Sequence, residues 1–218
     1  MKRSVLIVMV GILSLSVLVV WLKYLDMSRQ NVTSLESEGV QETIRDDSVA
    51  SVEEEVTPTL TVPMARADER VTKKPFGILI EPKTSPIQPE RFRGYHTGVD
   101  FEIFPEERLI DVPVLAVCEG MIVEKRRATG YGGVLVTNCV VEGKQVTIVY
   151  GHLRLSSIEK NKGQSVERGE VLGVLGTGGT PETDGERKHL HLGIHLGSVV
   201  NIVGYVDSVE RLSDWLDP

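Results

Sequence analysis

The sequence predicts a mainly β domain of antiparallel sheets, and three observations support this prediction. First, short runs of β-branched or alternating apolar residues recur through residues 73–218, separated by glycine and proline turn signals. Second, the 218 residues include 21 glycines and only 5% aromatic residues, which favours turn-rich β structure over a helix bundle. Third, this part of the chain offers one respectable helical pattern, the short segment 209–216.

The expected strands follow one another in chain order. They are residues 76–80, 98–103, 112–117, 120–125, 132–138, 144–153, 170–176 and 189–197. Segments 120–126 and 133–139 read as an antiparallel pair around a turn near Gly130, with position 139 opposite about position 120. Cys118 and Cys139 would then be near-diagonal neighbours. Export would permit a disulfide, but buried free thiols are common, so we expect free thiols and keep the disulfide as the alternative.

The N-terminus carries a long apolar segment. Met1-Lys2-Arg3 precedes residues 4–22, which contain no charged residue. About 18 or more apolar residues can cross a bilayer as a helix, and the basic residues before them favour a cytoplasmic N-terminus. We therefore expect residues 1–23 to be an uncleaved transmembrane anchor in the cytoplasmic membrane, with the rest of the chain exported. The alternative is a cleaved signal peptide, although the apolar run exceeds the usual length of its hydrophobic region.

Residues 24–72 have a different composition. They hold eleven acidic and four basic residues, and the resulting charge of -7 equals the net charge of the whole chain. Such a segment cannot bury enough apolar surface to offset its ordering entropy, so we expect a disordered acidic stalk followed by a folded domain at 73–218. The absence of any basic excess argues against a nucleic-acid partner, and we expect a monomer.

Four of the five histidines fall into three short elements separated by β segments. His96 and Asp100 form an H-x-x-x-D pair at the start of a strand. His152 follows a glycine at the end of an apolar strand. His189 and His191 form an H-x-H on one face of a strand whose other face is Leu and Ile. Each element alone fits histidines at a solvated strand surface equally well, because imidazole and carboxylate are zinc ligands only when they converge.

Taken together, the order and flanks of these elements resemble the M23 family of zinc metallopeptidases, the lysostaphin-type or LytM-type peptidoglycan endopeptidases. The resemblance covers most of the chain from Phe92 to Val206. It includes the phrases HTGVDF, VPVLAVCEGMIV, GYGGVLV, VYGHL, GQSVERGEVLGVLGTGG and HLHLGI. It implies the antiparallel fold of a LytM-type peptidase domain over residues 73–218.

The resemblance also implies roles for five residues. His96, Asp100 and His191 would bind Zn²⁺ and leave a fourth position open for water, as a catalytic zinc requires. His189 would be the general base, and His152 would stabilise the oxyanion or share the proton transfers. The order of these last two roles stays open at this point. His195 lies beyond Gly193 on the same strand, and we expect it outside the metal site.

The chain departs from the family pattern in the lead into H-L-H, which is long and charged here (residues 178–188). The residue after H-L-H is Leu192, where the family usually has an aromatic residue. The function implied is zinc-dependent hydrolysis of peptide bonds in peptidoglycan. The alternative is a non-catalytic M23-like domain that binds and activates other cell-wall hydrolases. A cupin-like barrel is disfavoured, because no glutamate follows H-x-H closely.

Overall fold

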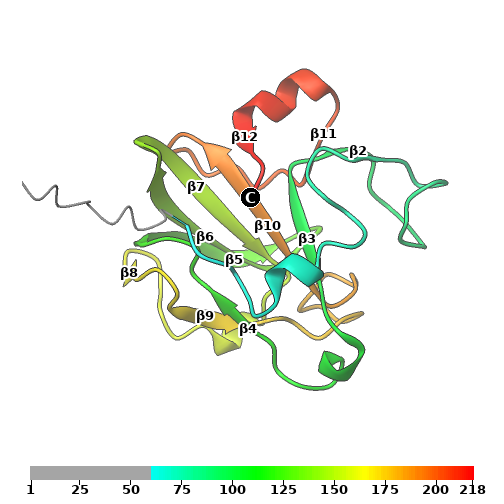
Figure 1. Cartoon of the computed structure of the whole chain (residues 1–218). Coiled ribbons are helices and arrows are strands. Elements are labelled where there is room, and N and C mark those ends of the chain that lie inside the picture. The colour runs from blue at the N-terminus through cyan, green and yellow to red at the C-terminus, as the bar shows by residue number, and fades with distance from the viewer. Residues whose placement is uncertain (1–59) are drawn as a thin grey trace, which may run out of the picture. The chain divides into compact units, whose positions relative to one another are not determined.

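The computed structural model describes residues 60–218 (Figure 1). The expected anchor at residues 1–23 and the expected stalk up to residue 59 lie outside the described residues. Within residues 60–218, no helix is both long enough and apolar enough to span a membrane. The described part of the chain is built from strands and short 3-10 helices, in agreement with the expected mainly β class.

Residues 60–218 form twelve β-strands and four 3-10 helices (η). The strands are β1 (Leu79–Ile80), β2 (Gly94–His96), β3 (Gly98–Glu102), β4 (Pro113–Leu115), β5 (Gly120–Ala128), β6 (Gly132–Val141), β7 (Lys144–Gly151), β8 (Ser165–Val166), β9 (Val171–Val174), β10 (His189–Leu196), β11 (Tyr205–Val206) and β12 (Trp215–Leu216). The helices are η1 (Ala67–Glu69), η2 (Pro105–Glu107), η3 (Leu155–Ser157) and η4 (Val209–Asp214).

The main sheet is antiparallel and has β10 near one end, between β7 and β3 (Figure 1). Its order is β12-β10-β7-β6-β5-β8. One edge of β10 pairs with β7 from His191 to Leu196. The other edge pairs first with β3, from His189 to Gly193, and then with β12. Two smaller sheets, β1-β2-β11 and β4-β9, complete the fold.

The alternation of histidine and aliphatic residues in β10 separates two faces of the sheet. Leu190, Leu192 and Ile194 are at most 2% exposed and belong to the main hydrophobic core. The same core contains Val114 of β4 and Leu172 of β9. Burying one such aliphatic side chain stabilises the fold by about 1.5–3 kcal/mol, so the core fixes the register of β10 and turns His189 and His191 to the opposite face.

The segment before residue 73 belongs to the folded domain, which corrects the expected stalk boundary at residue 72. The backbone N–H of Asp100 donates to Lys74 O and that of Glu102 donates to Arg70 O, each at 3.0 Å. Residues 70–74 therefore lie along the outer edge of β3. We call this segment the strap.

Contacts with residues far along the chain hold the strap in place, which explains why its polar composition does not indicate that it is folded. The guanidinium of Arg70 binds both carboxylate oxygens of Glu107 at 2.7 Å and lies over the ring of Phe104. Met64, a few residues earlier, is 1% exposed and belongs to the main core. These partners are remote in sequence, so no local pattern of hydrophobic residues indicates the contacts.

The expected helix at 209–216 is also corrected. Residues Val209–Asp214 form the 3-10 helix η4, and Trp215–Leu216 form the strand β12. Trp215 pairs with His195 of β10 and is 5% exposed. Extended backbone at this point lets Trp215 reach the sheet, so the helical pattern ends after six residues.

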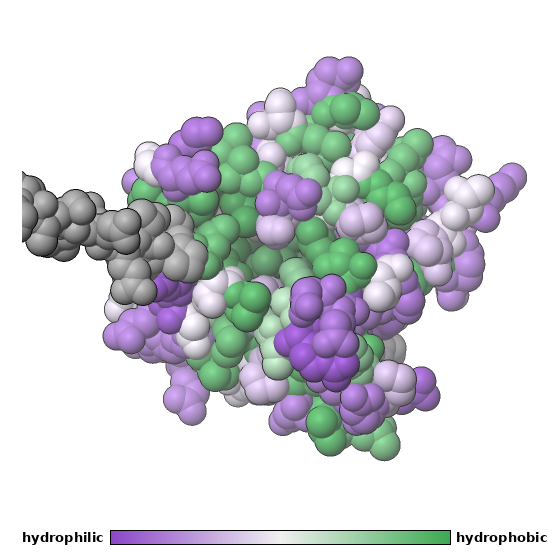
Figure 2. All heavy atoms as spheres, in the orientation of Figure 1, coloured by the Kyte–Doolittle hydropathy of each residue, from purple (hydrophilic) through white to green (hydrophobic). Residues whose placement is uncertain are grey.

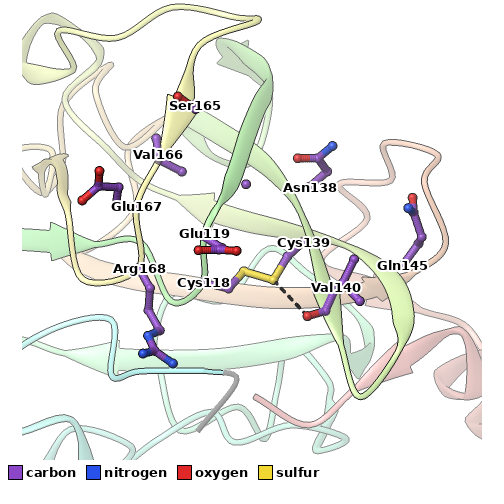
Figure 3. A pocket seen from close by; sticks show the side chains of 11 residues that line it. Cys118, Glu119, Asn138, Cys139, Val140, Gln145, Ser165, Val166, Glu167 and Arg168 are labelled. Atoms are coloured by element: carbon purple, nitrogen blue, oxygen red, sulfur yellow. Dashed lines mark hydrogen bonds between the residues drawn. A yellow bond between two sulfur atoms is a disulfide. The ribbon is translucent and has the colours of Figure 1, made fainter. Parts of the chain in front are cut away.

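The β5–β6 hairpin confirms the expected register at the end near Cys139, and a β-bulge between Ile122 and Glu124 shifts the other pairs by one position. Ile122 pairs with Thr137, which is the alignment that sets position 120 against position 139. Cys118 and Cys139 are joined by a disulfide, so the expectation of free thiols is wrong. Figure 3 shows this bond among the side chains that line a hollow. The hollow holds about 920 Å³, and none of the expected site residues lines it.

A second hollow is apolar. Figure 2 shows hydrophobic surface around a depression on the face presented there. A groove of about 570 Å³ runs between residues 60–76 and the core side of β3 and β10, where Val99, Phe101, Leu192 and Ile194 contribute to its wall. The expected site residues do not line this groove either.

Candidate metal centre

Strand pairing brings the two halves of the expected site together. His191 of β10 stands directly opposite Asp100 of β3 in the sheet register. His96 is the last residue of β2 and is fully buried. Only Thr97 separates it from the first residue of β3. His96, Asp100 and His191 thus form the one group of three or more potential metal ligands within residues 60–218.

The three ligand atoms form a compact triangle. His96 Nε2 lies 3.0 Å from His191 Nδ1, His191 Nδ1 lies 3.2 Å from Asp100 Oδ1, and Asp100 Oδ1 lies 3.3 Å from His96 Nε2. Ligand atoms about 2.0–2.1 Å from a tetrahedral zinc lie about 3.3–3.4 Å apart. Two imidazoles and one carboxylate at this spacing fit a zinc ion with a free fourth position.

The surroundings set the protonation that metal binding needs. His96 Nδ1 donates to the carbonyl of Pro75 at 3.2 Å, which leaves Nε2 with a lone pair. Burial lowers the pKa of His191 to about 4, so its ring is neutral near pH 7. Burial raises the pKa of Asp100, but His189 and His96 oppose this and hold that pKa well below 3.8, so the carboxylate is ionised.

Gly98 makes the close packing of the centre possible. A Cβ at this position would lie 2.3 Å from the carbonyl oxygen of Leu192 and 2.9 Å from His191 Nε2. Both distances are shorter than real contacts allow. Any side chain here would push β3 away from β10 and separate Asp100 from His191.

His189 and His152 lie beside the triangle. Their ring centroids are 4.2 Å apart. His189 Nδ1 is 2.9 Å from the carbonyl oxygen of Arg187 and donates its hydrogen there, so Nε2 is the ring nitrogen that can take up or release a proton. That Nε2 lies 3.3 Å from Asp100 Oδ2. A base is therefore held next to a metal ligand.

The backbone of His152 is in the left-handed region, with φ of 63°. Such strain is uncommon for a residue other than glycine and concentrates at functional sites. Its Nδ1 is buried and has no hydrogen-bond partner among the described residues. Burial lowers the pKa of His152 well below 6.5, so the ring is neutral. His152 is thus held in a costly conformation with one ring nitrogen unpaired.

Two further residues at the site were not found by the sequence analysis. The Tyr131 ring contacts the rings of His152 and His191, with centroids 5.5 and 5.3 Å apart, and its buried hydroxyl has no partner within residues 60–218. Arg187 binds Asp100 at 2.7 Å. Tyr131 sits in the Gly-Tyr-Gly-Gly turn, which was the available signal, whereas nothing in the sequence indicates the partner of Arg187.

His195 lies outside the group of ligands, as expected. It pairs with Thr147 of β7 and Trp215 of β12, and its ring packs against the Trp215 ring with centroids 4.9 Å apart. Gly193 separates it from the centre. Leu192 stands where the family usually has an aromatic residue. It is buried in the core, on the face of β10 opposite to His189 and His191.

A buried His-Asp-His triangle with an open side, flanked by two further histidines on an antiparallel sheet, defines a metallohydrolase of the single-metal type. The sequence profile of Peptidase family M23 matches residues 94–202, half of the chain. The chain belongs to this family.

Individual relatives are distant. Endolysin 2638A of Staphylococcus phage 2638A is 28% identical over 140 residues, which cover 59% of this chain and 28% of the endolysin. The chain therefore spans little more than a quarter of this curated relative. The lysostaphin catalytic domain from Staphylococcus simulans is similar at 23% identity and a TM-score of 0.45, over 70% of this chain and 91% of that one. Helicobacter pylori Csd3 is similar at 20% identity and a TM-score of 0.42, over 72% and 38%.

Proposed function

We propose that this protein is a zinc-dependent endopeptidase that hydrolyses peptide bonds in peptidoglycan and so remodels the cell wall. The observation that carries the proposal is the triangle of His96 Nε2, Asp100 Oδ1 and His191 Nδ1 in a chain of Peptidase family M23. Its dimensions fit zinc, and both accessory histidines stand beside it.

The residues of the chain divide the chemistry between them. Bound zinc would polarise the scissile carbonyl and lower the pKa of a water molecule toward neutrality. His189 takes the proton of that water at Nε2, since its Nδ1–H is committed to the carbonyl of Arg187. His152 and the Tyr131 hydroxyl are the free hydrogen-bonding groups beside the triangle, and they stabilise the oxygen on which negative charge develops.

The cleft beside the triangle is narrow. It holds about 80 Å³, and its lining includes Tyr131, Arg187, Tyr205 and the histidines His152, His189 and His191. Tyr205 stacks on His96 with ring centroids 5.1 Å apart and accepts a hydrogen bond from Lys74. A slim, extended peptide with small residues at the scissile bond suits such an opening, and links between glycines or small D-amino acids in peptidoglycan are of this kind.

The test is digestion of purified peptidoglycans of different cross-link types by the full-length zinc-loaded protein, followed by mass analysis of the fragments. We expect one cross-link type to be cut and the His191→Ala variant, assayed in parallel, to be inactive. Intact peptides in every substrate, from a protein that holds one zinc per chain, would contradict the proposal. The outcome would also identify the bond that is cut.

We also propose that residues 1–23 anchor the protein in the cytoplasmic membrane, with the peptidase domain outside and the chain monomeric. The support is the uncharged segment after Met1-Lys2-Arg3 and the position of the substrate outside that membrane. Protease added to cells with opened outer layers but an intact cytoplasmic membrane should release a soluble fragment that carries His191. Protection of this fragment until the membrane is lysed would show that the orientation is wrong.

A non-catalytic role as an activator of other hydrolases finds no support in residues 60–218. Such a role does not require a metal site, yet all three ligands converge here. It also does not require a strained histidine with an unpaired nitrogen, which His152 provides.

A further inference from the structure

The two oxygens of the Asp100 carboxylate have different surroundings. Oδ1 faces the triangle, 3.3 Å from His96 Nε2 and 3.2 Å from His191 Nδ1. Oδ2 points away from it and receives Arg187 Nη2 at 2.7 Å, with His189 Nε2 at 3.3 Å. One oxygen is therefore available to a metal, and the other is occupied by the protein.

The guanidinium of Arg187 is fixed by a second carboxylate. Its Nε lies 2.9 Å from Oε1 and 3.1 Å from Oε2 of Glu102, and its Nη2 lies 2.5 Å from Oε1. Glu102 and Asp100 are two residues apart in β3 and so share one face of the strand. Lys73 of the strap also binds Glu102, at 3.2 Å. Arg187 thus bridges two carboxylates that cannot move independently of it.

This arrangement is well shielded from water. The side chain of Arg187 is 18% exposed, and those of Asp100 and Glu102 are 2% and 11% exposed. Hydrogen bonds between charged groups are stronger than neutral ones, and a guanidinium offers them in a fixed plane. Arg187 therefore holds the Asp100 carboxylate in a fixed orientation, which an ion pair at the solvent-exposed surface would not do.

We propose that Arg187 is a positioning residue that restricts Asp100 to binding the metal through Oδ1 alone. The inference rests on the proposed function, because it takes the triangle as a zinc site. A carboxylate with both oxygens free can bind a metal through both, which would occupy the position that a catalytic zinc must leave open for water. Arg187 prevents this by holding Oδ2.

The long charged lead into H-L-H (residues 178–188) contains Arg187 and so positions the metal site. Arg187 stands at the end of that lead, two residues before His189, and its carbonyl also accepts the His189 Nδ1–H. One residue therefore orients a metal ligand with its side chain and the general base with its backbone. The rest of the lead is tied down independently, since Arg91 binds Asp184 and Glu186 at 2.8 Å.

The competing interpretation is that Arg187 only fastens β10 to β3. Metal-based measurements on full-length protein separate the two. The variants are R187Q, R187K and the matched control R91Q, which also removes an arginine that anchors the lead but touches none of the triangle residues. Each is loaded with zinc for affinity by chelator competition, and with cobalt(II) for its visible spectrum, which reports the coordination number. Thermal melts of the metal-free proteins report folding.

We expect wild type and R91Q to show the intense cobalt bands of a four-coordinate ion. R187Q should lose intensity as Asp100 binds through both oxygens, and its zinc affinity should fall about 10-fold or more, the usual effect of removing a group that orients a ligand. R187K keeps the charge but cannot reproduce the planar fork, so its spectrum should lie between the two.

An R187Q spectrum and zinc affinity equal to those of wild type would overturn the inference while leaving the proposed function intact. If R187Q fails to fold, R187K decides, and a wild-type cobalt spectrum in R187K would overturn the inference. A wild-type protein that binds no stoichiometric zinc would overturn both the inference and the proposed function.

Discussion

Replacing Cys118 and Cys139 together with alanine tests the covalent link between the start of β5 and the end of β6. Both residues are buried, at 2% and 7% exposure, so alanine avoids placing a new hydroxyl in apolar surroundings. Neither residue lines the metal centre. The double variant should therefore keep its zinc affinity and lose stability.

The size of the loss follows from the loop that the disulfide closes. The two cysteines are 21 positions apart, so the bond closes a loop of 22 residues. Releasing a loop of that length restores about 11 cal/mol/K to the unfolded chain, or about 3.4 kcal/mol at 25 °C in the chain-entropy account. For a domain of this size, 1 kcal/mol corresponds to about 2–4 °C. The metal-free double variant should therefore melt roughly 7–14 °C below wild type. Residual pairing of β5 with β6 in the unfolded chain would reduce this value.

Two measurements check the reasoning. Thiol labelling of the unfolded, unreduced wild type should find no reactive thiol, and labelling after reduction should find two. Thermal melts should then show wild type in reductant approaching the double variant. Two reactive thiols without reductant would refute the disulfide itself. A bonded wild type that melts within about 2 °C of the double variant would refute the loop-entropy argument.

Three other predictions concern the site and its support. Gly98→Ala should reduce zinc affinity and cost about 1–3 kcal/mol, because its Cβ would overlap the backbone of β10; chelator competition and denaturant unfolding measure both. His189→Ala should lose turnover by about 100-fold or more while holding one zinc per chain, whereas His191→Ala should lose the metal, as elemental analysis would show; full peptidase activity in His189→Ala would remove its role as base. The hydrogen bond from Arg70 lowers the pKa of Glu107 below 4.5, so this pair stabilises the fold above pH 4.5 and its contribution disappears as the pH falls through the lowered pKa. Melts of wild type and Glu107→Gln should accordingly converge below pH 4.5, and a constant difference down to pH 3 would contradict this.

The longer strands were predictable because their signals are local, whereas the short strands β2, β8, β11 and β12 were not expected. The ligand set was predictable only as what the family resemblance implies. The alternation of histidine and aliphatic residues in β10 sets both faces of the strand, and the hairpin around Gly130 has the expected register to within one residue. The strap and the roles of Tyr131 and Arg187 were not predictable in this way. Their positions depend on partners far along the chain, such as Glu102, 32 residues from Arg70 of the strap, and Asp100, 87 residues from Arg187. No period or turn rule reports contacts at that distance.

The disulfide was misjudged for a related reason. The register of β5 and β6 placed Cys118 and Cys139 close together, but proximity alone does not separate a bond from two buried thiols. Whether the two sulfur atoms can bond depends on the position of Cys118. This residue precedes β5, so its position depends on the path of the chain between β4 and β5. That path is set by the core rather than by the hairpin.

The strap has a consequence for anyone who joins this catalytic domain to another targeting module. Because the carbonyls of Arg70 and Lys74 accept the amide hydrogens of Glu102 and Asp100, the backbone upstream of residue 75 is part of the scaffold that aims a metal ligand. A fusion junction at residue 73, where composition suggests one, would remove the Arg70 part of this scaffold and leave the amide of Glu102 on the edge of β3 without its partner. A junction before Leu60 would keep it.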